Sequence, residues 1–366
     1  MSNFDIANIA LQSVCPNNEM LYDDKGMPSV MVKIPKCSWA DLGIGTSTAT
    51  FPAFIVNGVE KDCIYFSKYQ NIVQNSRAYS LPGQDPGNNI TLDTSISRCT
   101  AKGEGWHLQT KLEWMAVALW CLKNGTQPKG NNNYGRDVSE TVYKAIPSMA
   151  RDSSNRIQRV ATGTGPLTWS HDGTPSGIWD MNGNVSEWVG GIRLVKGELQ
   201  VISKDGLAFG NDAADPTNSQ SATSSLWYAI DGTTGDLITP DGNGTTANSL
   251  KADWVSSAWK WITGTITSQS TTYHSCSLES VTADSDVCEK AQHILMALGM
   301  LPISGLSAGA LNGDQLYLIN GEAERSFICG GGWTRSASAG VFYAGGSNPR
   351  TNAFANFGFR SAYTAP

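Results

Sequence analysis

The sequence predicts an α+β fold, and two kinds of segment support that prediction. Segments such as 28–35 and 62–69 mix apolar and β-branched or aromatic residues and are typical of strands with a buried face. A stretch at about 110–123 has apolar residues at helical spacing and begins with a helix-capping signal. Strands with a hydrophobic face need a second layer to cover it, and such helices supply that layer.

The first part of the domain is predicted to be β-structure. Pro28-Ser-Val-Met-Val-Lys-Ile-Pro indicates a strand, and residues 51–60 follow with Asn57-Gly58 as a turn signal. Asp62-Cys-Ile-Tyr-Phe-Ser-Lys-Tyr predicts a second strand. Residues 1–27, which precede these strands, are interpreted as an N-terminal extension that packs on the body.

Helices are predicted to cover these strands. The first spans about 93–102. In the second, Thr110 and Glu113 form a capping box, and Lys123-Asn124-Gly125 supplies the cation and glycine typical of a helix C-terminus. Its apolar face is formed by Leu112, Met115, Ala116, Leu119 and Trp120. A later helix is predicted at about 286–300.

The remaining chain is richer in polar and turn residues. Residues 126–175 are predicted to be mainly loop, 177–191 a turn and strand bracketed by tryptophans, and 192–202 a hairpin. Ser, Thr, Gly, Asn and Asp then dominate a long stretch with isolated tryptophans. We interpret about 196–320 as an insertion into a single domain that spans 28–366.

The bulk composition favours a loop-rich globular protein. The chain has 366 residues, a net charge of −6 and only 16% charged residues, which disfavours a nucleic-acid-binding surface. No apolar run reaches membrane-spanning length, and the N-terminus lacks the pattern of a secretory signal, so we expect neither membrane insertion nor a signal peptide. The eight scattered cysteines are expected to be free thiols, and a Cys276–Cys288 disulfide is the less favoured alternative.

The last residues, 330–363, have a distinctive composition, and we refer to them as the C-terminal strip. The strip contains no Lys, Asp, Glu, Gln, His, Met, Leu or Ile. A catalytic segment normally carries an acid, a base or a metal ligand. This strip offers small, aromatic, amide and hydroxyl side chains together with arginines, which is typical of a contact surface.

Six motifs along the chain together resemble one family. They are Pro52-Ala-Phe, Gly105-Trp-His-Leu, Leu112-Glu-Trp, Gly177-Ile-Trp-Asp-Met-Asn-Gly-Asn-Val-Ser-Glu-Trp, Gly330-Gly-Gly-Trp and Gly358-Phe-Arg. Their order is similar to that of the formylglycine-generating-enzyme-like (sulfatase-modifying factor) branch of the C-type lectin fold. The resemblance covers residues 28–195 and 320–363. It implies an α+β, C-type-lectin-like fold and leaves the long insertion unexplained.

Within that branch the strip resembles the variable region of a diversity-generating retroelement target protein. In such proteins adenine-directed mutagenesis rewrites the segment from GG-x-W to GFR, mostly at Asn codons of the AAC type. Changing the first two bases of AAC cannot yield Lys, Glu, Gln, Met or Trp, and none of these occurs between Thr334 and Phe357. The resemblance therefore implies a variable region at about 330–360.

The resemblance also divides the strip into framework and contact residues. The framework residues are Gly330, Gly331, Gly332, Trp333, Ala339, Gly340, Val341, Phe342, Arg350, Gly358, Phe359 and Arg360. The contact residues, which would be diversified and would bind ligand, are Thr334, Arg335, Ser338, Gly345, Ser347, Asn348, Asn352, Phe354 and Asn356, with Tyr343, Ala355 and Phe357 as additions. Phe354 is expected at the surface, and the ring of Phe357 is expected in the core. Arg350 and Arg360 are expected to brace loops.

An enzymatic function is the main alternative, and we expect none. Cysteine-oxidising members of the family use a copper-binding Cys pair after the GG-x-W motif, where this chain has Thr334, Arg335 and Gly340. The iron-dependent branch uses several histidines. This chain has only His107, His171, His274 and His293, with no H-x-x-x-H spacing. We interpret His107 as a structural histidine.

The loop 182–187 is a second candidate site. In related folds this loop can bind Ca²⁺, and Asn184 and Glu187 offer the oxygen ligands that hard cations prefer. The alternative, which we favour, is a tight turn of Asn and Gly in which Glu187 hydrogen-bonds the backbone. No other cofactor is expected.

The sequence thus predicts a ligand-binding protein with a diversified C-terminal surface. The expected partner is a protein or glycan on a target cell. The expected setting is a receptor-binding adhesin of a phage or prophage tail, located in the virion or in the cytoplasm before assembly. An oxidase-like enzyme of the same fold and a structural tail component are the alternatives. The ligand, the oligomeric state and the role of the insertion stay open.

Overall fold

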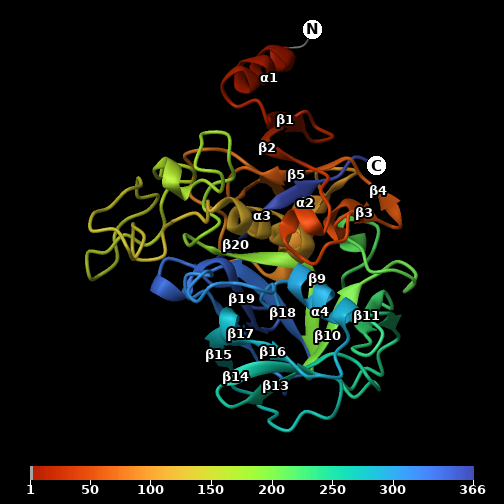
Figure 1. The fold of residues 1–366 in the computed structure, drawn as a ribbon. Coiled ribbons are helices and arrows are strands. Elements are labelled where there is room, and N and C mark those ends of the chain that lie inside the picture. The colour runs from red at the N-terminus through yellow and green to blue at the C-terminus, as the bar shows by residue number, and fades with distance from the viewer. Residues whose placement is uncertain (1–2) are drawn as a thin grey trace.

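The computed structural model describes residues 3–366 and confirms the predicted α+β class. A smaller sheet lies in the upper half of Figure 1 and a larger sheet in the lower half. The α-helices of the described chain are α1 (Asn3–Val14), α2 (Leu92–Thr100), α3 (Lys111–Asn124) and α4 (Glu289–Ala297).

The smaller sheet joins strands from both ends of the chain in the order β1-β2-β5-β21-β8. Their bounds are β1 (Asn18–Tyr22), β2 (Pro28–Pro35), β5 (Cys63–Ser67), β21 (Ser361–Tyr363) and β8 (Trp106–Leu108). The last strand pairs antiparallel with β5 and β8, so that Ala362 lies opposite both Phe66 and His107. The end of the C-terminal strip is therefore fixed inside a sheet that the N-terminal third of the chain builds.

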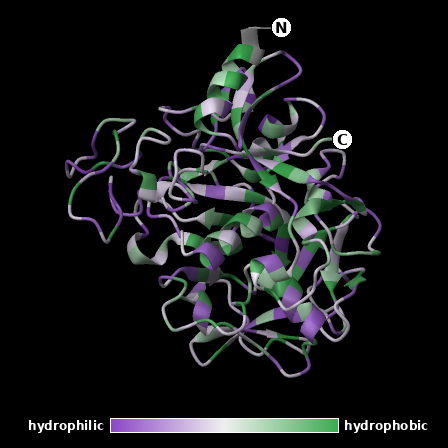
Figure 2. Ribbon diagram, turned by 45° about the horizontal axis from the view of Figure 1, so that its top comes forward, coloured by the Kyte–Doolittle hydropathy of each residue, from purple (hydrophilic) through white to green (hydrophobic). Residues whose placement is uncertain are grey.

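Part of the predicted N-terminal extension belongs to this sheet. β1 pairs with β2 from Asn18 opposite Val32 to Tyr22 opposite Pro28. The helix α1 packs against β1, where Asn8 Oδ1 accepts a hydrogen bond from the Met20 N–H at 2.9 Å. Figures 1 and 2 show α1 projecting from the body while still carrying hydrophobic residues.

The larger sheet has twelve strands, many of them from the predicted insertion. Its main path is β15-β17-β19-β18-β9-β10-β13-β14-β16, and β11, β12 and β20 pair beside it. Their bounds are β9 (Ser186–Val195), β10 (Glu198–Ile202), β11 (Trp227–Ile230), β12 (Leu237–Ile238), β13 (Lys251–Val255), β14 (Ala258–Ile262), β15 (His274–Ser277), β16 (Thr282–Ala283), β17 (Gln315–Leu318), β18 (Arg325–Gly330), β19 (Gly340–Asn348) and β20 (Phe357–Phe359). Residues 196–320 are thus continuous with the sheet that holds the strip.

Two predicted turns have the backbone geometry that their residues favour. The hairpin β3 (Ile55–Val56)–β4 (Val59–Glu60) turns through Asn57 at φ 51° and Gly58 at φ 76°. The β9–β10 hairpin turns through Lys196 at φ 48° and Gly197 at φ 89°. Positive φ at both central residues gives a two-residue turn whose twist matches the paired strands. A third short hairpin joins β6 (Ile72–Gln74) to β7 (Arg77–Tyr79).

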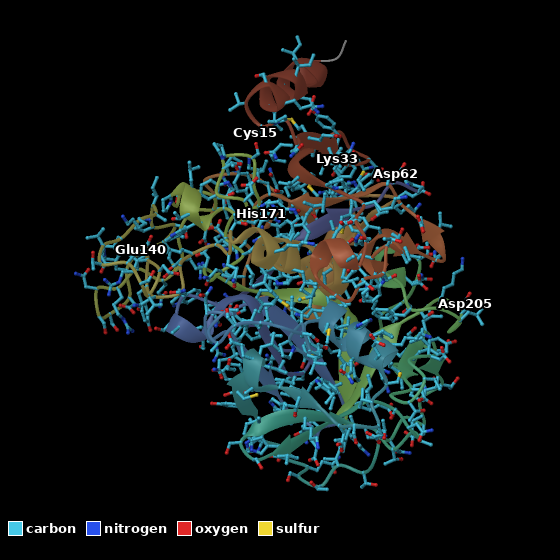
Figure 3. All side chains as sticks on the ribbon, viewed as in Figure 1. Cys15, Lys33, Asp62, Glu140, His171 and Asp205 are labelled. Atoms are coloured by element: carbon cyan, nitrogen blue, oxygen red, sulfur yellow. The ribbon has the colours of Figure 1, made fainter. Side chains whose placement is uncertain are left out.

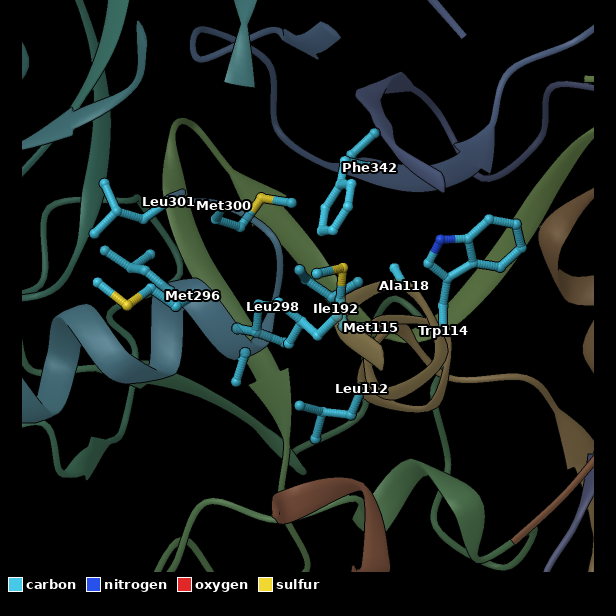
Figure 4. Close-up of a cluster of buried hydrophobic side chains, with 14 of the residues drawn as sticks. Leu112, Trp114, Met115, Ala118, Ile192, Met296, Leu298, Met300, Leu301 and Phe342 are labelled. Atoms are coloured by element: carbon cyan, nitrogen blue, oxygen red, sulfur yellow. The ribbon is translucent and has the colours of Figure 1, made fainter. Parts of the chain in front are cut away.

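The predicted capping box of α3 is present. Thr110 Oγ1 accepts a hydrogen bond from the Glu113 N–H at 3.2 Å, and Glu113 Oε2 accepts one from the Thr110 N–H at 2.9 Å. Gly125 ends the helix in the left-handed conformation. The helix lies in the main core, where Leu112 and Met115 point toward Leu298, the residue after α4 (Figure 4). α4 itself is shorter than the predicted 286–300.

One helix prediction is wrong: Trp120 is 39% exposed and does not belong to the buried face of α3. The helix is buried on almost every side up to Leu119, and Trp120 lies where it emerges from the core, with its ring 5.3 Å from that of His171. Other tryptophans outside segment 196–320 are buried, among them Trp106, Trp114, Trp179, Trp188 and Trp333.

The tryptophans of segment 196–320 mostly pack inward. Trp227, Trp259 and Trp261 are buried, and Trp254 is half-buried with its ring stacked on His274 at 4.7 Å. All eight cysteines are free. Among residues 3–366, no helix combines the length and the hydrophobicity needed to cross a bilayer. Residues 138–156 lie in a mostly exposed loop region that projects from the body, on which Glu140 is labelled in Figure 3.

Candidate ligand-binding surface

The C-terminal strip passes through both sheets. It leaves β18 at Gly330, turns through residues 331–339, and continues as β19. The turn includes the short 3₁₀ helix η6 (Ser336–Ser338), and the loop 349–356 leads on to β20 and β21. Because β19 lies between β17 and β18, its backbone is held on both sides, while the turn and the loop lie outside the sheets.

The structure buries all of the framework residues that the resemblance implies. Two of the glycines among them, Gly331 and Gly340, leave no room for a side chain. A Cβ on Gly340 would lie 2.0 Å from the Asp314 Oδ1, and a Cβ on Gly331 would lie 2.7 Å from the Ala339 Cβ. Gly331 also has a φ of 73°, which L-residues with a side chain adopt at a cost. The backbone of the turn 331–339 is therefore closely constrained.

Two arginines brace the strip from within. Arg360 donates two hydrogen bonds of 2.7 Å to the Glu187 carboxylate, and both side chains are buried. Arg350 donates to Glu324 at 2.9 Å and to Asp93 at 2.7 Å. Bidentate and charge-assisted pairs of this kind fix geometry as well as charge. The contacts fit the bracing role expected for both arginines.

Nine of the twelve predicted contact residues reach solvent wholly or in part. They are Thr334, Arg335, Ser338, Ser347, Asn348, Asn352, Phe354, Ala355 and Asn356. Phe354 is 49% exposed, as expected. Asn352 Nδ2 donates a hydrogen bond to Asn348 Oδ1 at 3.1 Å, so the loop 349–356 adjoins the end of β19.

The turn and the loop also approach each other over two consecutive glycines. A Cβ on Gly331 would lie 3.4 Å from the Arg335 Cγ, and a Cβ on Gly332 would lie 3.4 Å from the Asn356 Cβ. Arg335 from the turn and Asn356 from the loop thus lie over adjacent points of the same backbone. We call the region formed by the nine solvent-reaching residues the contact surface.

The other three predicted contact residues lie beneath this surface, so the prediction that they contact a ligand directly is corrected. Tyr343 is 1% exposed, Phe357 is 4% exposed, and Gly345 is buried. Tyr343 and Phe357 share a hydrophobic cluster with Trp188, whose ring meets that of Phe357 edge-on at 5.4 Å. A Cβ on Gly345 would press against Ile328 at 3.1 Å. These residues support the surface, and Phe357 lies in the core as expected.

Sequence reasoning missed two residues beside the surface, Tyr273 and Tyr317. The Tyr317 ring lies 5.6 Å from the Tyr343 ring and 5.7 Å from the Tyr273 ring. The guanidinium carbon of Arg335 lies 5.0 Å from the Tyr317 ring centre and 5.6 Å from that of Tyr343. Only the pairing of β17 with β19 and of β15 with β17 brings these tyrosines to the strip, and no local motif signals it.

The candidate Ca²⁺ loop is occupied by hydrogen bonds within the protein. Asn184 Oδ1 accepts from the Val160 N–H at 2.9 Å and from Asn131 Nδ2 at 3.2 Å. Glu187 accepts from Gln70 and Gln109, each at 3.0 Å, in addition to Arg360. A cation would have to displace these donors. The favoured turn interpretation needs one correction, because Glu187 pairs with side chains and not with the backbone.

The histidines occupy structural positions. His107 is hydrogen-bonded to Glu113 at 2.8 Å and to the Gly105 carbonyl at 2.9 Å. Burial opposes its charged form, but the Glu113 carboxylate outweighs burial and raises the pKa of His107. Burial lowers the pKa of His171 to about 4, and its Nδ1 accepts from the Ile178 N–H at 2.7 Å. In the described part of the chain, no group of three or more His, Cys, Asp or Glu has a metal-binding arrangement.

Comparisons with known proteins place the chain near two solved structures. No family model matches it, and no curated protein matches it. PvdO from Pseudomonas aeruginosa is 12% identical, with 95% of this chain and 98% of that chain covered and a TM-score of 0.35. Treponema denticola variable protein 1 is also 12% identical, with 95% and 99% covered and a TM-score of 0.33. At these scores the proposals below rest on the motifs and the geometry alone.

Proposed function

We propose that this protein binds ligands through a C-terminal surface whose residues are diversified. The carrying observation is how the strip is divided in space: every implied framework residue is buried, whereas nine of twelve implied contact residues reach solvent. A rigid scaffold that presents replaceable side chains is what a diversified binding surface requires.

The chemistry of the contact surface supports recognition without catalysis. Hydroxyl, amide, aromatic and guanidinium groups face solvent there, and the strip contains no acid or histidine. Thr334, Arg335 and Gly340 stand where oxidising relatives would carry cysteines. We propose that no bond is made or broken, and that the partner is a protein or glycan of a target cell.

The proposed setting is a receptor-binding adhesin of a phage or prophage tail, in the virion or in the cytoplasm before assembly. Exposed side chains on such a surface bind weakly one by one, and multivalent display on a particle would raise the overall avidity. A reverse transcriptase gene beside a near-copy of the region encoding 330–363, differing mainly at adenines, would support diversification. Sequencing the surrounding genome checks this directly.

The most direct test is a display library of the full chain in which the nine residues of the contact surface are randomised. Because these residues all reach solvent, where substitutions usually cost little stability, many members are expected to keep the fold. A matched library randomises nine framework residues of the same strip, and most of its members are expected to unfold. Protease resistance followed by sequencing measures both libraries.

Equal intolerance of the two libraries would show that the strip is merely packed, as in a structural tail component. Selection of the tolerant library on target cells then measures binding. Binders whose randomised positions converge on one sequence per target would support recognition through this surface. Turnover of a substrate by the parent chain, abolished by a change in the strip, would favour the enzymatic alternative.

A further inference from the structure

Arg335 differs from the other arginines of the strip in having no partner for its charge. Arg350 and Arg360 each pair with carboxylates. The guanidinium of Arg335 has no hydrogen bond and no ion pair with any residue of 3–366, and its Nε is buried without an acceptor. The terminal Nη groups are not among the buried unpaired atoms, and they too lack a partner, so they are the donors open to an incoming acceptor.

The neighbouring acid does not neutralise this charge. Asp314 lies beside the strip, with its Oδ2 accepting from the Phe342 N–H at 2.8 Å. Burial raises the pKa of Asp314 well above its ordinary value and so favours its neutral form. The strip itself has no acidic residue, and no ion pair among residues 3–366 involves Arg335, so its positive charge has no paired carboxylate.

Aromatic rings hold that charge in place. Arg335 lies over Tyr317 and Tyr343, and the rings of Tyr273, Tyr317 and Tyr343 follow one another at 5.7 and 5.6 Å. Their exposure falls along the row, from 61% at Tyr273 to 1% at Tyr343. A guanidinium stacked on aromatic rings keeps its N–H edge free, because stacking uses its face. We call these four residues the arginine–tyrosine cluster.

We propose that the arginine–tyrosine cluster binds a carboxylate side chain of an acidic protein segment, with Tyr273 and Tyr317 as a constant part of the binding site. This inference rests on the proposed function, since it assigns a ligand chemistry to the contact surface. The segment 196–320 would thereby supply fixed aromatic contact area beside a variable strip. Tyrosine next to short serine and asparagine side chains is the composition of protein-recognition surfaces.

The test uses the full chain labelled with ¹⁵N-arginine and two capped peptides, Ala-Glu-Ala-Glu-Ala and its twin with Gln in place of Glu. The Arg335 Nε–H signal is assigned by its absence in Arg335→Gln. The Glu peptide is expected to shift this signal saturably, and the Gln twin is not. Because Arg335→Gln removes that signal, isothermal titration calorimetry measures the affinity of this variant, and the loss of a charge-assisted pair is expected to weaken binding at least about tenfold. Arg98→Gln on α2 removes the same charge elsewhere and should leave the affinity unchanged.

Separate variants test Tyr273 and Tyr317, the constant part of the site. Tyr273→Ala changes an exposed residue and keeps the fold, and Tyr317→Leu removes a half-buried ring. Each variant is expected to weaken binding of the Glu peptide roughly threefold, because it removes a ring that holds the arginine cation in place. Tyr228→Leu, also half-buried but on β11, is the matched control and should have no effect. Unchanged affinity in Tyr273→Ala would exclude that tyrosine from the site.

An Arg335 signal that ignores the Glu peptide, or that responds equally to both peptides, would overturn the inference. Tighter binding of N-acetylneuraminic acid than of the Glu peptide would assign the site to an acidic glycan and overturn the protein partner. The two proposals fail separately. If the contact-surface library folds but the Arg335 signal does not shift, the proposal of a diversified surface is kept and the carboxylate site is rejected. If that library unfolds but the Glu peptide shifts the Arg335 signal, only the carboxylate site is kept.

Discussion

Asp180 is a buried acid whose ionisation opposes the fold. It lies ahead of β9 with a φ of 62°, and its carboxyl is buried. Its Oδ2 accepts from the Gly163 N–H at 2.8 Å, whereas its Oδ1 has no partner within the described residues. Burial raises the pKa of Asp180 from its ordinary value to about 6.

The raised pKa fixes the direction of a pH dependence. The stability that Asp180 contributes is fully present below about pH 4 and is lost as the pH rises through 6, because only the unfolded chain ionises freely. The loss is on the order of 3 kcal/mol. Asp180→Asn, which tolerates the same φ, is expected to remove the part of this slope that Asp180 causes, while other shifted groups such as Asp314 and His107 keep their contributions. Urea unfolding from pH 4 to 8 measures it.

Asp205→Asn, at an exposed aspartate labelled in Figure 3, is the matched control and should keep the wild-type slope. A stability difference between Asp180→Asn and the wild type that stays constant with pH would contradict the assignment. The burial of this carboxyl could not be predicted from the sequence, because it depends on segments distant along the chain. Its surroundings come from segments about twenty to two hundred residues away, including Gly163 and Arg360.

At the scale of elements, the turn after β18 decides how the contact surface is presented. Gly331→Ala adds a Cβ 2.7 Å from the Ala339 Cβ at a φ of 73°. The left-handed conformation and the contact together are expected to cost at least about 2 kcal/mol. Gly264→Ala has open space within 4 Å and should change stability by within about 0.5 kcal/mol. Chemical denaturation compares the two, and equal effects would show that the turn can relax.

Local elements were the most predictable from sequence. The capping box of α3 and the turns at Asn57-Gly58 and Lys196-Gly197 depend on neighbouring residues, and all three were confirmed. Trp120 was placed wrongly because helical spacing defines faces but not where a helix leaves the core. Tertiary contacts decide which residues are buried, and the spacing of apolar residues along a helix carries no information about those contacts.

At the scale of the whole molecule, segment 196–320 shares one core with the rest of the chain, because one buried hydrophobic cluster holds Trp261 and Leu298 together with Leu112 and Met115 of α3. Trp261 on β14 is fully buried, and its Nε1–H donates to the Met300 carbonyl at 2.7 Å. Trp261→Ala is therefore expected to destabilise the entire protein by roughly 3–5 kcal/mol in one transition. Trp120→Ala, at an exposed site, should cost about 1 kcal/mol or less. Calorimetry that shows two transitions, with only one shifted, would instead make the segment a separate folding unit.

The sequence by itself determined the α+β class and the local turns and caps, and its resemblance to a known family implied which residues of the strip form a framework. These follow from residue chemistry over short distances and from motifs in a fixed order. Only the tertiary structure decided that Tyr343, Gly345 and Phe357 lie beneath the surface and that Tyr273 and Tyr317 border it. Burial and neighbourhood depend on which strands pair across the sheet, and the parallel pairing of β17 with β19 joins segments that no local pattern connects.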